Sequence, residues 1–407
     1  MNILLVVGDS IRQDSSTNIF KSRIIQEIAK YGNVYVLMDD SNHSEGKYEQ
    51  VVLENVTYYI FSRKLWFHYV TDYLRKSHGV SKRNHSQMAN HKTKSGAFLR
   101  LYQTFNEKYV SIFLKKYRFN SSWLRNIKSF NSSVVFDYVI SISHPPASHN
   151  AAVSLIAEGN IKSKRYIQVW FEPWFQVPFN KNKTELILQE EKSLISEADA
   201  IFYVSPIFCD NQKLLFQQYA KKMNYIDLPI VINKSAKNNI IRRSTKINVG
   251  YFGNYYSSIR NIIPLYKAIR LNPDVNGIII GNSDIHLEGK NNLVCKSRVS
   301  YNAIKEYEFS SDILVVLSNF EYQIPGKVYD YSQTNKYVLF VLDGEKGLKR
   351  KLREYYSTFN RYVFCENSVE DISLKIEEIS IGKYKSINNS PVSQFDVKNV
   401  VRKIIDV

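Results

Sequence analysis

The 407-residue sequence predicts an α/β protein with two doubly wound, Rossmann-like domains that face each other across a cleft. Two observations support this fold class. Short apolar runs such as NILLVVG at 2–8 alternate with amphipathic stretches such as IFKSRIIQEIAKYG at 19–32, which is typical of a parallel sheet covered by helices. The alternation stops in a polar, basic stretch at 231–246 and then begins again. We therefore expect two sheets joined by a linker.

The predicted N-terminal domain covers residues 1–230. After the first strand and helix, it contains several short apolar runs that are expected strands, at 33–40, 55–62, 137–143, 165–174 and 200–206. An amphipathic stretch at 208–224 is an expected helix. The strand-helix order predicts that the ends of these strands share one edge of a sheet.

A basic insertion at about 63–130 interrupts this pattern. From Arg63 to Lys128 the chain carries 15 lysines and arginines against two acids, which is +13 of its formal net charge of +17. Such a local field favours an anionic partner, namely nucleic acid, a phosphorylated substrate or an acidic membrane surface. A solvated lysine-rich surface would give the same composition. Residues 98–117 form a basic amphipathic pattern, which fits core packing or contact with a membrane surface.

The predicted C-terminal domain covers residues 247–390. Its expected strands are again short apolar runs, at 247–254, 275–282, 313–318, 337–342 and 361–366. Residues 391–407 are an expected C-terminal helix that can pack back on the N-terminal domain. Ligands in such folds bind beyond the carboxyl ends of the strands, so the functional residues are expected there.

The composition indicates a cytoplasmic protein. No apolar stretch approaches the roughly 20 residues of a membrane helix, and the N-terminus lacks the basic region of a signal peptide. The three cysteines, Cys209, Cys295 and Cys365, have neither metal-ligand spacing nor a disulfide pattern.

The stretch NFEYQIPGKVYDY at 319–331 places a lysine where a helix is expected to begin. A helix N-terminus favours negative charge, so Lys327 behind Pro325 and Gly326 suggests that an anion binds there. Asp330 shares the helix face with Lys327. A cation for a diphosphate beside a carboxylate for ribose hydroxyls would hold a nucleotide. An exposed ion pair between the two residues explains the sequence equally well.

A second stretch, VGYFGNYYSSIR at 249–260, strengthens the nucleotide hypothesis. Gly253 and Asn254 can form a tight turn whose amides face a phosphate, and Arg260 suits bidentate contact with phosphate oxygens. An ordinary strand-helix turn with a surface arginine is the alternative.

With these motifs, the second half of the chain resembles the C-terminal domain of GT-B glycosyltransferases, most closely the family 4-type enzymes of bacterial polysaccharide assembly. The segments that carry the resemblance are 249–260, 310–342 and 395–404. The resemblance implies a nucleotide-sugar donor site in which Asp330 holds ribose, Arg260 and Lys327 neutralise the diphosphate, and Glu321 contacts the sugar. It also implies that transfer retains the anomeric configuration.

The chain departs from the family pattern at two places. Glu321 and Asp330 are separated by eight residues, where the family has two glutamates separated by seven. The family's lysine shortly after the arginine is absent from 261–265, and Lys327 is expected to replace it.

The N-terminal domain is expected to supply the acceptor site. The predicted acceptor-binding residues follow the strands at their carboxyl ends and are Gly8, Asp9, Ser10, Glu172 and Trp174. His144 also follows a strand and can assist proton transfer or hold the donor, because its imidazole titrates near neutral pH. A loop histidine without a catalytic role is equally compatible with the sequence.

The sequence therefore predicts a glycosyltransferase that moves a sugar from a nucleotide-diphosphate sugar to a lipid-linked glycan acceptor, held on the inner face of the membrane by the basic segment. The expected catalytic residues are Glu321, His144, Arg260 and Lys327. The expected donor-binding residues are Gly253, Asn254, Arg260, Glu321, Pro325, Gly326, Lys327 and Asp330. No cofactor and no metal are expected, because no DxD-type acidic cluster stands out at a strand end; the nearest to one, Asp39 and Asp40, lies in the other half.

Two alternatives compete with this function. A nucleotide-sugar epimerase shares the fold but acts on a soluble substrate, which leaves the basic segment without a role. A basic nucleic-acid-binding protein needs only the charge; no recognised nucleic-acid motif is present, so no nucleic-acid partner is expected.

Overall fold

The computed structural model describes residues 1–8, 16–40, 48–62, 121–143, 146–176, 185–232, 246–257, 260–318, 324–388 and 390–407. Four predicted site residues, Asp9, Ser10, His144 and Glu321, lie outside these ranges, as do 63–120 of the basic segment and 233–245 of the linker. The chain divides into two compact units. The first contains Met1–Trp174 and Glu185–Ile201, and the second contains Phe202–Val407 with a short segment that begins at Phe175.

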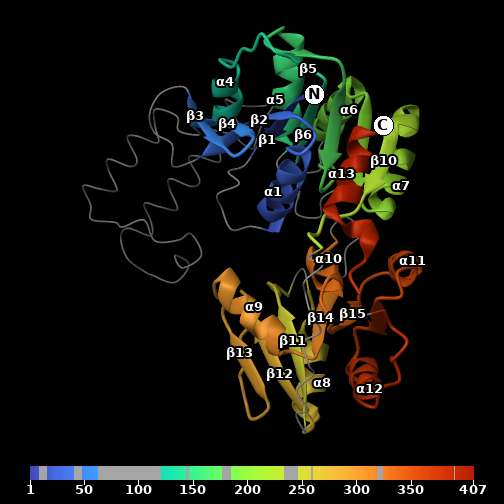
Figure 1. The fold of residues 1–407 in the computed structure, drawn as a ribbon. Coiled ribbons are helices and arrows are strands. Elements are labelled where there is room, and N and C mark those ends of the chain that lie inside the picture. The colour runs from blue at the N-terminus through green and yellow to red at the C-terminus, as the bar shows by residue number, and fades with distance from the viewer. Residues whose placement is uncertain are drawn as a thin grey trace, which may run out of the picture. The chain divides into compact units, whose positions relative to one another are not determined.

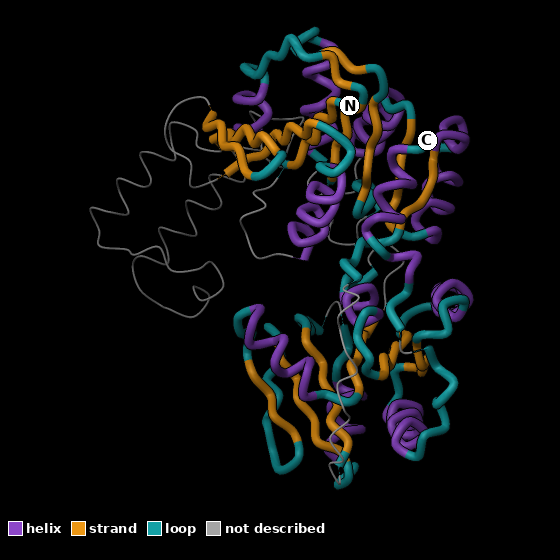
Figure 2. Tube along the Cα trace, viewed as in Figure 1, coloured by secondary structure: helices purple, strands orange, loops and turns teal. Residues whose placement is uncertain are grey.

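The first sheet has eight strands in the order β10-β9-β8-β6-β1-β2-β4-β3 (Figures 1 and 2). Its strands are β1 (Asn2–Val7), β2 (Asn33–Asp40), β3 (Tyr48–Leu53), β4 (Val56–Ser62), β6 (Tyr138–Ile142), β8 (Tyr166–Trp170), β9 (Ala200–Val204) and β10 (Met223–Ile226). From β8 to β4 the neighbouring strands run parallel, and β3 is antiparallel to β4. The chain therefore places the carboxyl ends of β8, β6 and β1 beside one another.

The apolar runs of this sheet are buried because helices cover them. From Ile3 to Val7 every residue of β1 is buried, which is typical of a parallel strand with both faces covered. The helices of this part of the chain are α1 (Ser16–Ile28), α4 (Ser121–Ile127), α5 (Ala147–Ala157), α6 (Glu185–Glu197) and α7 (Pro206–Leu215). Two short strands, β5 (Val135–Phe136) and β7 (Lys162–Ser163), pair separately.

The expected helix at 208–224 is wrong in its second half. Ser205 caps α7 by accepting the Ile207 amide at 3.1 Å, and Pro206 occupies the first turn. The helix ends at Leu215 and gives way to a 3₁₀ turn, Gln217–Lys222, and then to β10. The sequence after Leu215 is also compatible with a longer helix, which is why the expected helix was too long.

The second sheet has six parallel strands in the order β13-β12-β11-β14-β15-β16. They are β11 (Ile247–Phe252), β12 (Val275–Ile280), β13 (Leu293–Lys296), β14 (Ile313–Ser318), β15 (Tyr337–Leu342) and β16 (Tyr362–Glu366). The helices are α8 (Ile263–Leu271), α9 (Tyr301–Ser310), α10 (Lys327–Ser332), α11 (Lys346–Ser357), α12 (Val369–Ser380) and α13 (Val397–Ile405), with a 3₁₀ turn at Ser393–Phe395. None of the described helices has the length and apolarity needed to cross a membrane.

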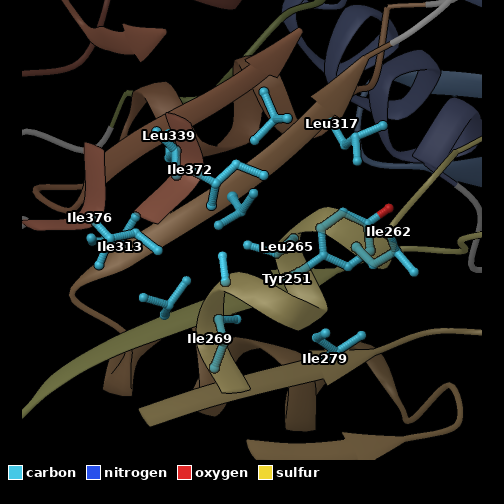
Figure 3. Packing of buried hydrophobic residues seen from close by; sticks show 14 of the residues in the cluster. Tyr251, Ile262, Leu265, Ile269, Ile279, Ile313, Leu317, Leu339, Ile372 and Ile376 are labelled. Atoms are coloured by element: carbon cyan, nitrogen blue, oxygen red, sulfur yellow. The ribbon is translucent and has the colours of Figure 1, made fainter. Parts of the chain in front are cut away.

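One continuous core lies between this sheet and the helices α8 and α12. Leu265 and Ile269 of α8 and Ile372 and Ile376 of α12 belong to the same buried cluster as Ile313 of β14, and Figure 3 shows them together. Each of these aliphatic side chains contributes about 1.5–3 kcal/mol when fully buried. The sheet edge above this core is therefore a rigid base for a binding site.

The C-terminal segment is held by the chain that follows β10. Ile230 accepts the Val397 amide and donates its own amide to Phe395, both at 2.8 Å. In α13, the Lys403 ammonium lies 5.1 Å from the centre of the Tyr225 ring of β10. The helix thus contacts a strand that the sequence places within residues 1–230.

A buried carboxylate lies at the centre of this contact. Asp227 is 1% exposed and accepts the Tyr355 hydroxyl at 2.8 and 2.9 Å and the Gln394 amide at 2.9 Å. Burial raises the pKa of Asp227, although both hydrogen bonds and the charge of Lys403 act in the opposite direction. The folded protein therefore holds a proton on this group more tightly than the unfolded chain does.

This raised pKa predicts how stability depends on pH. The contribution of Asp227 is greatest below its unfolded pKa and falls as the pH rises through the raised folded value. Asp227→Asn stays uncharged, so its melting temperature relative to wild type should increase between pH 4 and pH 7. Exposed Asp274, replaced in the same way, should show no such trend. Parallel pH profiles of wild type and Asp227→Asn would contradict the prediction.

Candidate functional site

The candidate site is the edge of the second sheet where its strands end, and the turn after β11 is built into it by backbone contacts. Gly253 donates its amide to Ile280 at 2.9 Å, and Tyr255 donates to Asn282 at 3.0 Å. A Cβ at Gly281 would lie 1.9 Å from the Gly253 carbonyl oxygen, so this position requires glycine. The turns after β11 and β12 are thus fixed against each other.

Arg260 is anchored to this turn. Its Nη1 donates to the Asn254 carbonyl at 3.1 Å, and the Tyr251 hydroxyl donates to the same oxygen at 3.2 Å. Burial raises the pKa of Tyr251, and the charge of Arg260 opposes that rise. Asp284 accepts the Ser257 amide at 2.7 Å, which fixes the chain just before Arg260. Two of the predicted donor residues, Asn254 and Arg260, are therefore in direct contact, with Gly253 next to them.

At this edge, one asparagine links the chain that follows β15 to the chain that precedes α8. Asn367 donates its side-chain amide to the Asn261 carbonyl at 2.9 Å and to the Asp343 carboxylate at 2.8 Å. The Asp343 amide donates to the Ser318 carbonyl at 2.9 Å. Within the described ranges, the buried Ser318 hydroxyl and the buried Asn367 Oδ1 have no hydrogen-bond partner. Unsatisfied buried polar atoms are uncommon, and a ligand is one way in which they are satisfied.

The helix that carries Lys327 and Asp330 is short, and its first turn is already bonded. α10 contains six residues, Lys327–Ser332. The amides of Val328, Tyr329 and Asp330 donate to the carbonyls of Pro325 and Gly326 at 2.9–3.1 Å. We expected free amides here for an anion. The structure instead satisfies these three within the turn, so they are not available to an anion.

The structure pairs Lys327 with an acid that the sequence did not single out. Its Nζ lies 2.6 Å from the Glu308 carboxylate on α9, and its side chain is 25% exposed. Glu308 is 5% exposed and also accepts Lys305 at 2.7 Å. The Lys327 ammonium additionally lies 5.1 Å from the centre of the Tyr331 ring. Lys327 is thus enclosed on two sides by α9 and α10.

Tyr331 is a buried tyrosine that lies close to these charged groups. Its side chain is fully buried, and its hydroxyl has no hydrogen-bond partner in the described part of the chain. Burial raises its pKa, and the negative charges of Glu308 and Asp330 raise it further, with a smaller contribution from Tyr251. Lys327 lies against the Tyr331 ring, and Arg260 donates to the same carbonyl as the Tyr251 hydroxyl, so each predicted diphosphate cation lies beside a buried tyrosine.

A buried arginine fixes the other end of α10. Arg361 is 0% exposed, and its guanidinium donates to the carbonyls of Tyr331 and Ser332, both at 3.2 Å. It also donates to those of Thr334 and Lys336, both at 2.7 Å. Burial lowers the pKa of Arg361 to about 10, so it stays charged at neutral pH. A cation is favoured where the last carbonyls of a helix are exposed.

In the first unit, the predicted acceptor residues follow strands that lie next to one another. Gly8 follows β1, and Glu172 and Trp174 follow β8, with β6 between those strands. The Trp174 amide donates to the fully buried Glu191 carboxylate at 3.3 Å. The structure brings these strand ends to one edge.

A buried polar cluster below this edge was not found from the sequence. His149 is fully buried, its Nδ1 lies 2.7 Å from the Ser141 hydroxyl, and its ring centre is 4.0 Å from that of Trp170. Burial lowers the pKa of His149 well below its ordinary value, and the charge of Lys21 adds to this effect. Trp170 donates to Gln168 at 2.9 Å, which supports core packing for this tryptophan. No local motif marks this cluster.

Nothing in the described ranges gathers three or more His, Cys, Asp or Glu side chains as a set of metal ligands.

We expect Arg361→Met to destabilise the protein by about 3 kcal/mol, because it leaves buried carbonyls without donors. Arg361→Lys should be intermediate, since an ammonium keeps the charge but lacks the planar fork of donors. Denaturant unfolding of the three proteins measures the difference. Equal stability of wild type and Arg361→Met would contradict this role.

We expect Gly281→Ala to destabilise the protein by about 2–3 kcal/mol, since the new methyl group would overlap backbone atoms of Gly253. Gly347→Ala is the matched control, because a Cβ there meets nothing within 4 Å. The free energy of unfolding of that control should be unchanged or higher by about 0.4–1 kcal/mol. Thermal unfolding distinguishes the two, and similar melting temperatures for both variants would show that the close approach is not rigid.

Comparison with known proteins identifies the fold. No protein-family model matches the sequence, and no curated protein matches it. Among similar solved structures, sucrose-phosphate synthase from Thermosynechococcus elongatus has a TM-score of 0.57 at 12% identity, covering 99% of this chain and 94% of that one. A glycosyltransferase from Rickettsia africae has a TM-score of 0.55 at 14% identity, covering 100% and 97%.

HepE from Anabaena, solved in complex with UDP-glucose, has a TM-score of 0.53 at 13% identity, covering 100% of this chain and 98% of that one. These likenesses extend over nearly the whole length of both chains, and they confirm the predicted fold class. The chain has the GT-B fold of glycosyltransferases, with two Rossmann-like domains.

Proposed function

We propose that the protein is a glycosyltransferase that moves a sugar from a nucleotide-diphosphate sugar to a lipid-linked glycan acceptor in surface polysaccharide assembly. The observation that carries the proposal is the full-length likeness to HepE, which was solved with UDP-glucose. A trehalose-6-phosphate synthase from E. coli, solved with UDP-2-fluoro-glucose, has a TM-score of 0.52 at 9% identity. A uridine diphosphate sugar is therefore the first donor to test.

The donor site that we propose lies at the carboxyl edge of the second sheet. Breaking the bond between the anomeric carbon and the diphosphate oxygen leaves negative charge on the diphosphate. Arg260, held by the Asn254 carbonyl, is a preorganised cation for that charge, and Lys327 is the second. Asp330 is the proposed ribose ligand, and Glu321 the proposed contact to the sugar. Two cations make a metal-independent reaction feasible, and we propose that transfer retains the anomeric configuration.

The acceptor and the membrane role are proposed from charge. The segment at 63–130 holds most of the net charge of +17, which would favour an anionic lipid surface or a polyprenyl-diphosphate-linked acceptor. The residues at the edge of the first sheet, Gly8, Asp9, Ser10, Glu172 and Trp174, would bind the acceptor sugar. His144 would assist proton transfer or hold the donor.

We expect at least one nucleotide among UDP, GDP, ADP and CMP to raise the melting temperature of the wild type. At a hundredfold excess over its Kd, a ligand stabilises a protein by about 2.7 kcal/mol. Arg260→Ala with Lys327→Ala should abolish the shift, because both diphosphate cations are then absent. Arg402→Ala, which removes an exposed arginine on α13, is the matched control and should retain it.

A lack of stabilisation by every nucleotide would contradict the proposal. Tight, salt-dependent binding of DNA or RNA without nucleotide binding would favour the nucleic-acid alternative. Equal binding to neutral and anionic vesicles would contradict the electrostatic membrane role.

A further inference from the structure

A glutamate on α9 pairs with the lysine that the proposed donor site uses. Glu308 lies in the last turn of α9 (Tyr301–Ser310), and it is only 5% exposed. It accepts Lys327 at 2.6 Å and Lys305 at 2.7 Å. One nearly buried carboxylate therefore holds two ammonium groups from two helices.

The two lysines are not equivalent. Lys305 is three residues before Glu308 on the same helix and is 40% exposed. Lys327 comes from the start of α10, is 25% exposed and also lies against the Tyr331 ring. Lys305 is thus a local partner that stays beside Glu308 whatever happens to α10, whereas Lys327 reaches it from another element.

This arrangement allows Lys327 to leave without stranding a charge. Removing the one partner of a buried carboxylate is strongly unfavourable, because the charge is left uncompensated. Here Lys305 lies 2.7 Å from the same carboxylate, so Glu308 would keep a partner if Lys327 turned away, and most of that penalty would be avoided. Three amides of this turn, those of Val328, Tyr329 and Asp330, are bonded within the turn, so side-chain cations such as Lys327 would supply most of the charge for a diphosphate.

We propose that Glu308 is a positioning residue of the donor site, which holds Lys327 while the site is empty and releases it to the diphosphate of the donor. The inference rests on the proposed function. Glu308 then competes with the diphosphate for one ammonium group, and its own negative charge opposes the approach of the donor. Lys305 weakens this competition because it shares the carboxylate.

The test is the affinity of the full-length protein for UDP, measured by isothermal titration calorimetry. Glu308→Gln should bind UDP more tightly by about fivefold, since an amide cannot hold Lys327 by charge. Lys305→Ala should bind UDP more weakly by a similar factor, because Glu308 then depends on Lys327 alone. Glu308→Gln combined with Lys327→Ala should lose the gain and match Lys327→Ala.

Glu354→Gln is the matched control, because it removes a carboxylate from an exposed pair with Arg350 on α11, at 2.9 Å. Its UDP affinity should equal that of wild type. If Glu308 has a purely structural role, Glu308→Gln should bind UDP as tightly as wild type or more weakly, and that result would overturn the inference. The proposed function would still stand, provided that the wild type binds UDP. If Glu308→Gln does not fold, unchanged affinity in Lys305→Ala overturns it equally. A wild type that binds neither UDP nor another nucleoside diphosphate overturns both.

Discussion

The hydrogen bonds from Arg361 to the end of α10 fix the helix on which the candidate site depends. Four carbonyls, from Tyr331 to Lys336, point at one buried guanidinium. A helix of six residues has too few internal hydrogen bonds to be stable by itself. The arginine supplies the partners that the helix lacks. Lys327 and Asp330 are therefore held from behind, by a residue that cannot touch a ligand.

The same helix is also bound along its length. The Tyr362 hydroxyl donates to the Val328 carbonyl at 3.1 Å, and the hydroxyls of Tyr329 and Tyr356 lie 2.8 Å apart. At its start, Lys327 meets Glu308. The backbone of α10 is thus held by contacts that do not involve the side chain of Lys327. That side chain is paired with Glu308 and lies against the Tyr331 ring.

Whether an element can be predicted from the sequence depends on how buried that element is. The strands expected at 313–318 and 337–342 have the bounds of β14 and β15, because a continuous apolar run has few other structures. β3 and β13 were not predicted, since most of their residues are exposed or half-buried and leave no apolar run. Within the site, Asn254 and Arg260 were predicted as neighbours and are in contact. Glu308 and Arg361 were not predicted, because Lys327 is 19 residues from Glu308 and the carbonyls that Arg361 contacts are 25 to 30 residues from it.

The start of α10 differs from the expectation, and this changes which groups can offer positive charge to an anion. From the sequence, the helix N-terminus and Lys327 shared the task of facing an anion. In the structure the amides of Val328, Tyr329 and Asp330 are bonded within the turn, so the proposed site relies more on the side chains of Arg260 and Lys327. Arg260 bonds a neutral carbonyl and keeps its full charge for a ligand, whereas Lys327 is neutralised by Glu308. The two cations of the proposed site are therefore unequal: Arg260 would attract the diphosphate first, and Lys327 would add its charge once that diphosphate has displaced Glu308.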